Sequence, residues 1–210
     1  MLIKEILALG PLIPVVVIDD ADAAVPMARA LIAGGIRVIE VTLRTDTALA
    51  AIRRIAAEVP DAIVGAGTIL RPQQFTDIEQ AGAAFAVSPG ATPELLAAAR
   101  DSKIPFLPGA ATASEAMRLL ESGYHRMKFF PAESAGGAGL LASLASPLPD
   151  AKFCPTGGID PGNAESYLRL PNVVCVGSSW PVPAAAIRNG EWDKITERAR
   201  TCVALRRPPA

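Results

Sequence analysis

The sequence predicts an α/β fold, a (β/α)8 barrel (TIM barrel) that forms a single domain over residues 1–210. Eight apolar, β-rich runs alternate with alanine-rich helical segments along the whole chain. A strand–helix unit of about 26 residues, repeated eight times, accounts for the length. An open doubly wound sheet shows the same alternation, but eight units favour the closed barrel.

The expected strands are short and rich in valine and isoleucine, as in sheets that are buried on both faces. In chain order they cover residues 11–18, 37–43, 62–69, 84–89, 104–110, 126–132, 151–159 and 173–180. The clearest helices between them are expected at residues 23–35, 47–59, 92–100 and 113–123.

Several helix ends carry local signals. Thr92 before Pro93 and Asp160 before Pro161 have the pattern of N-terminal caps. Glycine follows other helices, as at Gly123. The last five residues, 206–210, are expected to be a frayed end.

The bulk composition excludes several classes of protein. The net charge is −1 with lysine and arginine scattered along the chain, so no basic stripe for nucleic acid is expected. Prolines interrupt the N-terminal segment before an export signal develops, and no apolar run reaches the roughly eighteen residues of a membrane span. Cys154, Cys175 and Cys202 are odd in number and lack metal-ligand spacing. We therefore expect a cytoplasmic protein with reduced thiols.

A carboxylate is expected inside the barrel. Side chains alternate along a strand, so Glu40 and Arg44 share one face of residues 37–43 and its continuation, opposite the apolar Ile39 and Val41. The apolar side suits the helix layer, which turns Glu40 and Arg44 inward. A buried carboxylate is costly unless it is paired or functional, and a structural ion pair between the two remains the alternative.

A lysine is expected to face the same interior. Lys128 lies toward the carboxyl end of its strand, on the face opposite Met127 and Phe129. A desolvated lysine near other charges can be partly neutral, as an amine nucleophile must be. The alternative is a lysine whose head group reaches the solvent at the barrel rim.

Polar and rigid residues follow two other strands at the carboxyl face, where barrel enzymes carry their active sites. Thr68 ends the third strand after glycines that permit close approach to the backbone, and it either binds substrate or caps the next helix. Pro89 makes a rigid turn with Gly90, which has a structural role at least as readily as a binding role.

The ends of the last two strands indicate an anion site. Gly157 and Gly158 precede one helix, and Gly177, Ser178 and Ser179 precede the next. Exposed N–H groups and serine hydroxyls at helix starts bind anions, and barrels commonly bind phosphate at these two loops. The pattern therefore predicts a phosphorylated substrate.

Metal and cofactor signals are missing from the sequence. The single histidine, His125, is placed at the amino end of its strand, and no cluster of histidine, cysteine and carboxylate has metal-ligand spacing. No dinucleotide glycine fingerprint follows the first strand. No metal and no cofactor are expected.

These motifs together resemble the family of 2-keto-3-deoxy-6-phosphogluconate (KDPG) aldolases, which overlaps with the 4-hydroxy-2-oxoglutarate (KHG) aldolases. The resemblance runs from about Pro11 to Trp192, in motif order. It rests on EVTLRT from Glu40, VGAGTIL from Val64, SPGATPELL from Ser88, KFFPAE from Lys128, CPTGGI from Cys154 and GSSW from Gly177. It implies a metal-free class I aldolase of the Entner–Doudoroff pathway that acts on a small 2-keto acid and assembles as a homotrimer.

By the same resemblance, Lys128 is the Schiff-base lysine and Glu40 the carboxylate that transfers protons. Arg44 and Thr68 are similar to the residues that hold the carboxylate of pyruvate. The reaction so implied cleaves the phosphorylated acid to pyruvate and glyceraldehyde 3-phosphate, or 4-hydroxy-2-oxoglutarate to pyruvate and glyoxylate. The sequence leaves open which aldehyde is preferred, the C4 stereochemistry and a side activity on oxaloacetate.

The resemblance also assigns the remaining pocket residues. Phe130 and Pro89 correspond to walls of the pyruvate pocket. The distal and phosphate-binding group comprises Thr156, Gly157, Gly158 and Ser179. This chain departs from the family at Ser178, where the family often has glycine. The added side chain either crowds the phosphate loop or contributes another hydroxyl.

Two rival functions fit parts of the pattern. A phosphate-binding barrel that isomerises or epimerises its substrate without a covalent intermediate shares the glycine turns but has no need of an inward lysine. A non-catalytic sugar-phosphate binder needs Lys128 only as a partner for Glu40.

Overall fold

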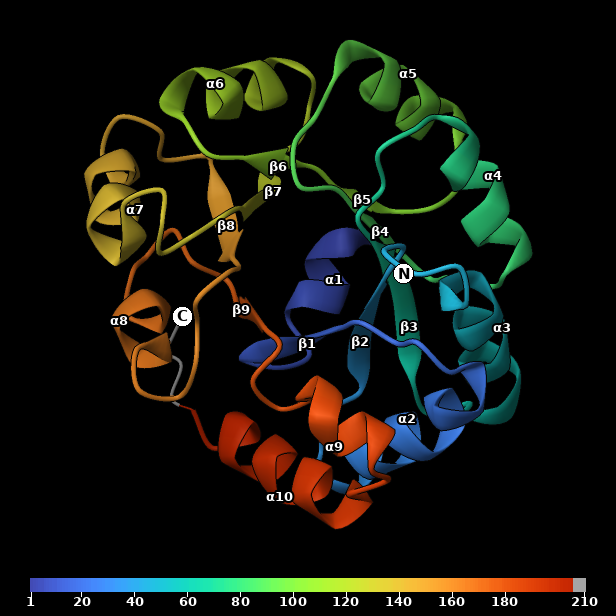
Figure 1. The fold of residues 1–210 in the computed structure, drawn as a ribbon. Coiled ribbons are helices and arrows are strands. Elements are labelled where there is room, and N and C mark those ends of the chain that lie inside the picture. Colours follow the sequence, from blue (N-terminus) through green and yellow to red (C-terminus); the bar gives the residue numbers. More distant parts are fainter. Residues whose placement is uncertain (206–210) are drawn as a thin grey trace.

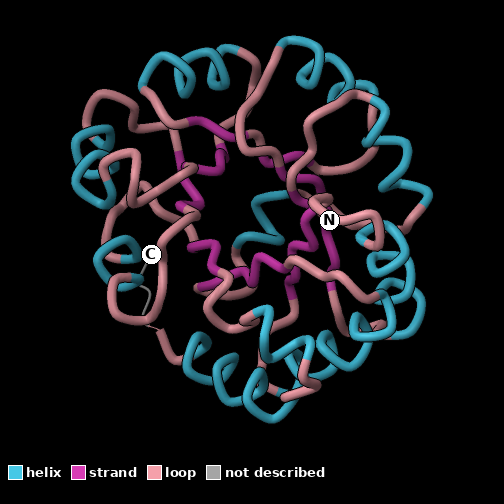
Figure 2. Tube along the Cα trace, in the orientation of Figure 1, coloured by secondary structure: helices cyan, strands magenta, loops and turns pink. Residues whose placement is uncertain are grey.

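The computed structural model describes residues 1–205 and shows a ring of parallel strands surrounded by helices (Figure 1). Strands form the inner layer, and helices cover the outside on all sides (Figure 2). The predicted barrel is confirmed. The frayed end expected for residues 206–210 lies outside the described residues.

The strands follow the predicted order with narrower bounds. They are β1 (Leu12–Val16), β2 (Val38–Thr42), β3 (Ile63–Gly67), β4 (Ala86–Val87), β5 (Phe106–Leu107), β6 (Gly109–Ala110), β7 (Arg126–Phe129), β8 (Lys152–Pro155) and β9 (Val176–Ser178). The single strand predicted over residues 104–110 is divided into β5 and β6 at Pro108, which has no N–H to donate to a ladder.

Strand pairing runs around the whole ring. One sheet has the order β5-β4-β3-β2-β1-β9 and the other the order β6-β7-β8, with every pair parallel. Isolated bridges from Phe153 to Val173 and from Thr156 to Gly177 join β8 to β9. Only Pro108 separates β5 from β6, so the two segments together occupy one strand position. The ring therefore has eight strand positions.

The helices cover the sheet from outside, apart from α1. They are α1 (Ile3–Leu7), the 3-10 turn η1 (Ala21–Ala23), α2 (Ala24–Ala33), α3 (Ala48–Glu58), α4 (Gln73–Gln80), α5 (Pro93–Asp101), α6 (Ala113–Glu121), α7 (Gly137–Ala145), α8 (Ala164–Leu168), α9 (Ala184–Arg188) and α10 (Trp192–Val203). None of the helices within residues 1–205 is long and apolar enough to cross a membrane.

Of the two predicted N-terminal caps, one is confirmed and one is wrong. The hydroxyl of Thr92 accepts a hydrogen bond from the N–H of Leu95 at 3.3 Å. Helix α8 begins only at Ala164, so Asp160 is not its cap. The Asp160 carboxylate instead accepts from the N–H of Gly162, because the Asp-Pro-Gly segment forms a turn before the helix starts.

Two apolar layers confirm the predicted facing of the strands. Ile39, Val41, Met127 and Phe129 belong to the large core between the strands and the outer helices. A smaller core fills the inside of the barrel and includes Ile6 and Leu7 of α1, Ile13, Val38, Phe85, Val87, Leu107, Cys154 and Cys175. Helix α1 lies within the ring in both ribbon views (Figures 1 and 2), so it closes the barrel interior beneath the site.

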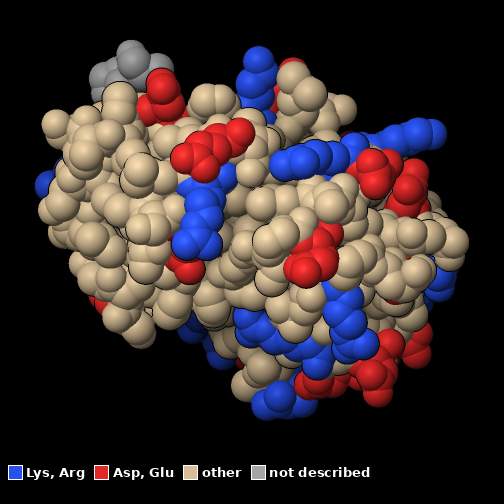
Figure 3. All heavy atoms as spheres, turned by 90° about the horizontal axis from the view of Figure 1, so that it is seen from above, with Lys and Arg blue, Asp and Glu red and all other residues tan. Residues whose placement is uncertain are grey.

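Charges on the surface are mixed. On the face drawn in Figure 3, lysine and arginine form separate groups with acidic residues beside them and uncharged residues between. All three cysteines are buried. Burial raises the pKa of the Cys202 thiol to about 12, so this thiol is protonated at neutral pH.

Candidate active site

Lys128 of β7 and Glu40 of β2 meet inside the barrel. The Nζ atom of Lys128 donates a hydrogen bond to Oε1 of Glu40 at 3.0 Å. The two side chains are 4% and 5% exposed, although they stand 88 residues apart in the chain. Strand alternation brings both inward, and barrel closure brings them together, because β2 and β7 are far apart in the strand order. The predicted inward positions of both residues are confirmed.

This buried pair is chemically poised for proton transfer. Removing two full charges from water costs several kcal/mol per ion, and their attraction only partly offsets that cost. The 3.0 Å hydrogen bond gives the Lys128 nitrogen a direct path for proton transfer to the Glu40 carboxylate. Glu40 is therefore placed to accept the proton that an amine nucleophile must lose.

Gly67, at the end of β3, makes room for the carboxylate. A Cβ at position 67 would lie 2.1 Å from Oε1 of Glu40, far inside van der Waals contact. The sequence had suggested that glycines near Thr68 admit a ligand, but the structure shows that Gly67 admits the Glu40 side chain and that Gly65 admits the ring of Phe85. Sequence reasoning missed this role, because it depends on the pairing of β2 with β3, in which Glu40 lies beside Gly65 and its side chain reaches Gly67.

We expect Gly67→Ala to lower kcat/KM by about 100-fold or more, because the new methyl group pushes Glu40 away from Lys128. Steady-state kinetics would measure this loss. Gly139→Ala is the matched control, since a Cβ at Gly139 meets no atom within 4 Å. Equal activity of the two variants would show that the position of the Glu40 carboxylate is not critical.

Three other predicted site residues make contacts near the Lys128–Glu40 pair, namely Arg44, Thr68 and Phe130. The guanidinium Nε of Arg44 donates to the hydroxyl of Thr68 at 3.4 Å, and Thr68 has a φ of +63°, which is rare for a branched residue. The Nζ atom of Lys128 lies 5.4 Å from the ring centroid of Phe130. Pro89, which follows β4, is half-buried, and its carbonyl packs against Gly109, the β6 partner of Lys128.

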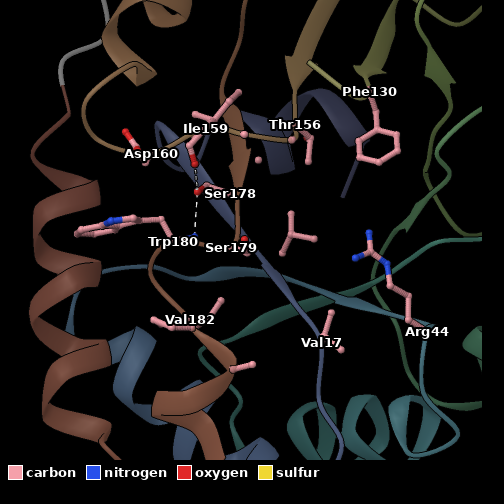
Figure 4. Close-up of a pocket in the computed structure, with 16 residues that line it drawn as sticks. Val17, Arg44, Phe130, Thr156, Ile159, Asp160, Ser178, Ser179, Trp180 and Val182 are labelled. Atoms are coloured by element: carbon pink, nitrogen blue, oxygen red, sulfur yellow. Dashed lines mark hydrogen bonds between the residues drawn. The ribbon is translucent and has the colours of Figure 1, made fainter. Parts of the chain in front are cut away.

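A pocket of about 630 Å³ opens at the carboxyl ends of β1, β8 and β9 (Figure 4). Its lining includes seven of the predicted site residues, namely Arg44, Phe130, Thr156, Gly157, Gly158, Ser178 and Ser179. Lys128, Glu40, Thr68 and Pro89 are not part of this lining. Phe130 and Arg44 connect the two parts, because Phe130 lies over Lys128 and Arg44 contacts Thr68. Sequence reasoning did not single out Val17, Trp180 and Val182, which also line the pocket.

Gly158 and Ser179, at the ends of adjacent strands, line this pocket. Gly158 has a φ of +75°, and a Cβ there would lie 2.7 Å from Cγ of Glu133, so both conformation and contact require glycine. No backbone acceptor within residues 1–205 takes a hydrogen bond from the N–H of Gly158 or of Ser179. Ser179 is also exposed, with its hydroxyl available. Such unpaired donors suit an anion.

Glu133 also connects the loop after β7 to α8. Its carboxylate accepts a hydrogen bond from the phenol of Tyr167, and its N–H donates to the carbonyl of Gly157 at 3.2 Å. Burial, and secondarily the hydrogen bond to Glu133, raises the pKa of Tyr167 above its usual value, so the phenol remains a donor at neutral pH. This contact holds the loops after β7 and β8 against each other.

His125 precedes β7 at its amino end, on the face away from the pocket, as predicted. Within residues 1–205 no group of three or more histidine, cysteine or acidic side chains is arranged to hold a metal ion.

The class of protein defined by this fold and site is a barrel lyase of the Schiff-base type. A lysine amine lies within hydrogen-bond reach of an acid inside the barrel, Phe130 connects this pair to the pocket, and unpaired anion donors line the pocket.

Comparison with known proteins identifies the family. A sequence model of "KDPG and KHG aldolase" matches residues 3–198, and the chain belongs to this family. The KHG/KDPG aldolase of Escherichia coli K12 is 53% identical over 200 residues, which are 95% of this chain and 94% of that protein.

Solved structures agree with this membership. The crystal structure of KDPG aldolase from Legionella pneumophila, with pyruvate captured as a covalent carbinolamine intermediate, matches with a TM-score of 0.94 and 50% identity over 96% of this chain and 98% of that one. The aldolase of Zymomonas mobilis ZM4 with 3-phosphoglycerate matches with a TM-score of 0.91 and 46% identity over 97% and 96% of the two chains. The chain is thus an aldolase. The isomerase and the non-catalytic binder considered above are not supported.

Proposed function

We propose that this chain cleaves 2-keto-3-deoxy-6-phosphogluconate to pyruvate and glyceraldehyde 3-phosphate through a Schiff base on Lys128. The observation that carries the proposal is the hydrogen bond of 3.0 Å between the buried amine of Lys128 and Glu40. The Legionella relative forms a covalent carbinolamine with pyruvate, the intermediate that such an amine produces.

The reaction starts when the neutral amine of Lys128 attacks the C2 carbonyl carbon. The carbinolamine loses its oxygen as water, and a protonated imine results. The C4 hydroxyl then loses its proton, the C3–C4 bond breaks, and its electron pair moves into the imine to form an enamine while C4 becomes the aldehyde carbonyl. Protonation of C3 and hydrolysis of the imine release pyruvate and restore the lysine.

Glu40 is the group that moves protons in these steps. It accepts the proton of the Lys128 ammonium first, and its carboxyl then supplies the proton with which the carbinolamine oxygen leaves as water. The regenerated carboxylate takes the proton of the C4 hydroxyl, directly or through a water. One acid suffices because each proton that it accepts is returned in a later step.

Arg44, Thr68 and Phe130 are proposed to bind the keto-acid end. A guanidinium offers two parallel N–H donors to a carboxylate, and Arg44 is already oriented by Thr68. The Phe130 ring shields the amine of Lys128 from water. Pro89 forms the opposite wall. Thr156 of the loop after β8 lies between this end and the distal loops.

The distal phosphate is proposed to bind between Gly157–Gly158 and Ser179. The unpaired N–H groups of Gly158 and Ser179, with the Ser179 hydroxyl, supply hydrogen bonds to phosphate oxygens. The Zymomonas relative was crystallised with a phosphorylated three-carbon acid. The family also includes aldolases of 4-hydroxy-2-oxoglutarate, so we propose slower cleavage of that unphosphorylated substrate to pyruvate and glyoxylate.

Pyruvate release, coupled to lactate dehydrogenase, tests the proposal. We expect the phosphorylated six-carbon acid to be cleaved with a kcat/KM at least about 100-fold above that of 4-hydroxy-2-oxoglutarate, because the second substrate cannot use the distal donors. Cleavage without pyruvate formation, or no cleavage of either acid, would refute the assignment.

We further propose that the chain assembles as a homotrimer in the cytoplasm. Support comes from the family resemblance. Light scattering coupled to gel filtration tests the assembly, and a mass other than three times that of the chain would contradict it.

A further inference from the structure

Ser178, the position where the chain departs from the family pattern, makes two hydrogen bonds that join two loops. Its hydroxyl donates to the carbonyl of Ile159 in the loop after β8. The same hydroxyl accepts from the N–H of Trp180 in the loop after β9, at 3.0 Å. Both bonds are drawn in Figure 4, where Ser178 stands between Ile159 and Trp180. Ser178 is 3% exposed, so the hydroxyl is buried with its donor in use.

The two residues held by Ser178 directly follow the two proposed phosphate donors. Ile159 follows Gly158, and Trp180 follows Ser179. Fixing the carbonyl of Ile159 and the N–H of Trp180 therefore fixes the distance between the unpaired N–H groups of Gly158 and Ser179. The distance between the donors decides whether both reach one phosphate group.

The loop after β9 is also anchored from outside. The Arg198 guanidinium of α10 donates to the carbonyl of Trp180 at 2.6 Å and lies 4.5 Å from the centroid of its ring. Ser178 itself pairs with Pro14 of β1. The loop after β9 is therefore anchored to β1 and to α10. The hydroxyl of Ser178 links this loop directly to Ile159 in the loop after β8.

We propose that Ser178 is a positioning residue that sets the spacing of the two phosphate-binding loops and thereby strengthens the preference for phosphorylated substrates. This inference rests on the proposed function of the same pocket. The Ser178 hydroxyl is committed to Ile159 and Trp180, so it acts through the loops rather than as a ligand of the phosphate. The adjacent Ser179 is exposed and its hydroxyl is not bonded to those loops, so Ser179 makes the direct contact.

Ser178→Ala tests the proposal through a comparison of two substrates. We expect KM for the phosphorylated acid to rise by about 5- to 50-fold, because the buried carbonyl of Ile159 and N–H of Trp180 lose their partner and the loops separate. The kcat is expected to change less than about twofold, because the loops bind the phosphate equally in the ground state and in the transition state. KM for 4-hydroxy-2-oxoglutarate is expected to stay the same.

Inorganic phosphate is the second probe. Its inhibition constant against cleavage of 4-hydroxy-2-oxoglutarate is expected to rise in Ser178→Ala by about the same factor as KM. Ser143→Ala is the matched control. It removes an exposed hydroxyl of α7 that donates to the carbonyl of Gly139, away from the pocket. Should the alanine variant not fold, Ser178→Cys keeps the volume and weakens both hydrogen bonds, with the same direction expected.

The outcomes separate the inference from the function on which it rests. If the unmodified enzyme cleaves both substrates with equal kcat/KM, phosphate recognition by these loops is refuted, and so is the positioning role of Ser178. If the unmodified enzyme prefers the phosphorylated acid but Ser178→Ala has unchanged constants, or raises KM equally for both substrates, only the role of Ser178 is overturned.

Discussion

Lys128→Met is expected to lower kcat/KM by about 10⁴-fold or more, because among residues 1–205 no other amine is bonded to Glu40 and able to form the imine. Methionine keeps an unbranched side chain of similar reach and removes only the nucleophile. Pyruvate release measures the loss. Methionine also fills the volume of the lysine side chain, so the variant is expected to fold.

A covalent trap makes this prediction independent of kinetics. Borohydride with pyruvate should leave a reduced pyruvyl group on the peptide that contains Lys128, detected by its mass. Lys152→Met is the control, because Lys152 begins the neighbouring strand and donates to the carbonyl of Pro171 at the amino face of the barrel. A label on another lysine, or strong turnover by Lys128→Met, would remove the Schiff base from this residue.

Glu40→Gln is expected to reduce kcat by about 10²- to 10⁴-fold, the usual contribution of a positioned general acid–base group. Glutamine retains the shape and a hydrogen bond to Lys128 but cannot accept the proton that the amine must lose. Binding of pyruvate, followed by its inhibition of turnover, should persist, because Arg44 and Thr68 are unchanged.

The control for Glu40→Gln is Glu121→Gln, which makes the same change on the exposed surface of α6. Near-normal turnover of Glu40→Gln would assign proton transfer to water or to substrate instead. Slowed borohydride labelling with pyruvate would support the role of Glu40 in imine formation, since that step also needs the carboxylate.

Much of the barrel followed from local pattern. The β-rich runs matched all the strands, and the alternation in residues 37–43 and 126–132 placed Glu40 and Lys128 inward as the structure has them. Side chains alternate between the two faces of a strand whatever the strand pairs with, so the local sequence indicates which face each residue occupies. The errors were local as well. Pro108 divided a strand, and the Asp160 turn delayed the start of α8.

The contacts that complete the site were not visible in the sequence. Gly67 is needed because the Glu40 side chain reaches it diagonally across the strand pair, in which Glu40 lies beside Gly65 and Thr42 beside Gly67, and register is a property of paired strands. The sequence left open whether Ser178 crowds the phosphate loop or adds a hydroxyl to it, and in the structure its hydroxyl joins Ile159 to Trp180. The sequence also did not predict that α1 lies inside the barrel, where Ile6 and Leu7 join the inner core.

The sequence alone determined the α/β alternation, the inward faces of β2 and β7 and, by resemblance, the family of the chain. Only the tertiary structure decided that Lys128 and Glu40 lie 3.0 Å apart and that Ser178 links the two loops of the distal pocket. The physical reason is that periodicity is set by covalent neighbours, whereas these distances depend on closure of the ring between strands that are remote in the chain.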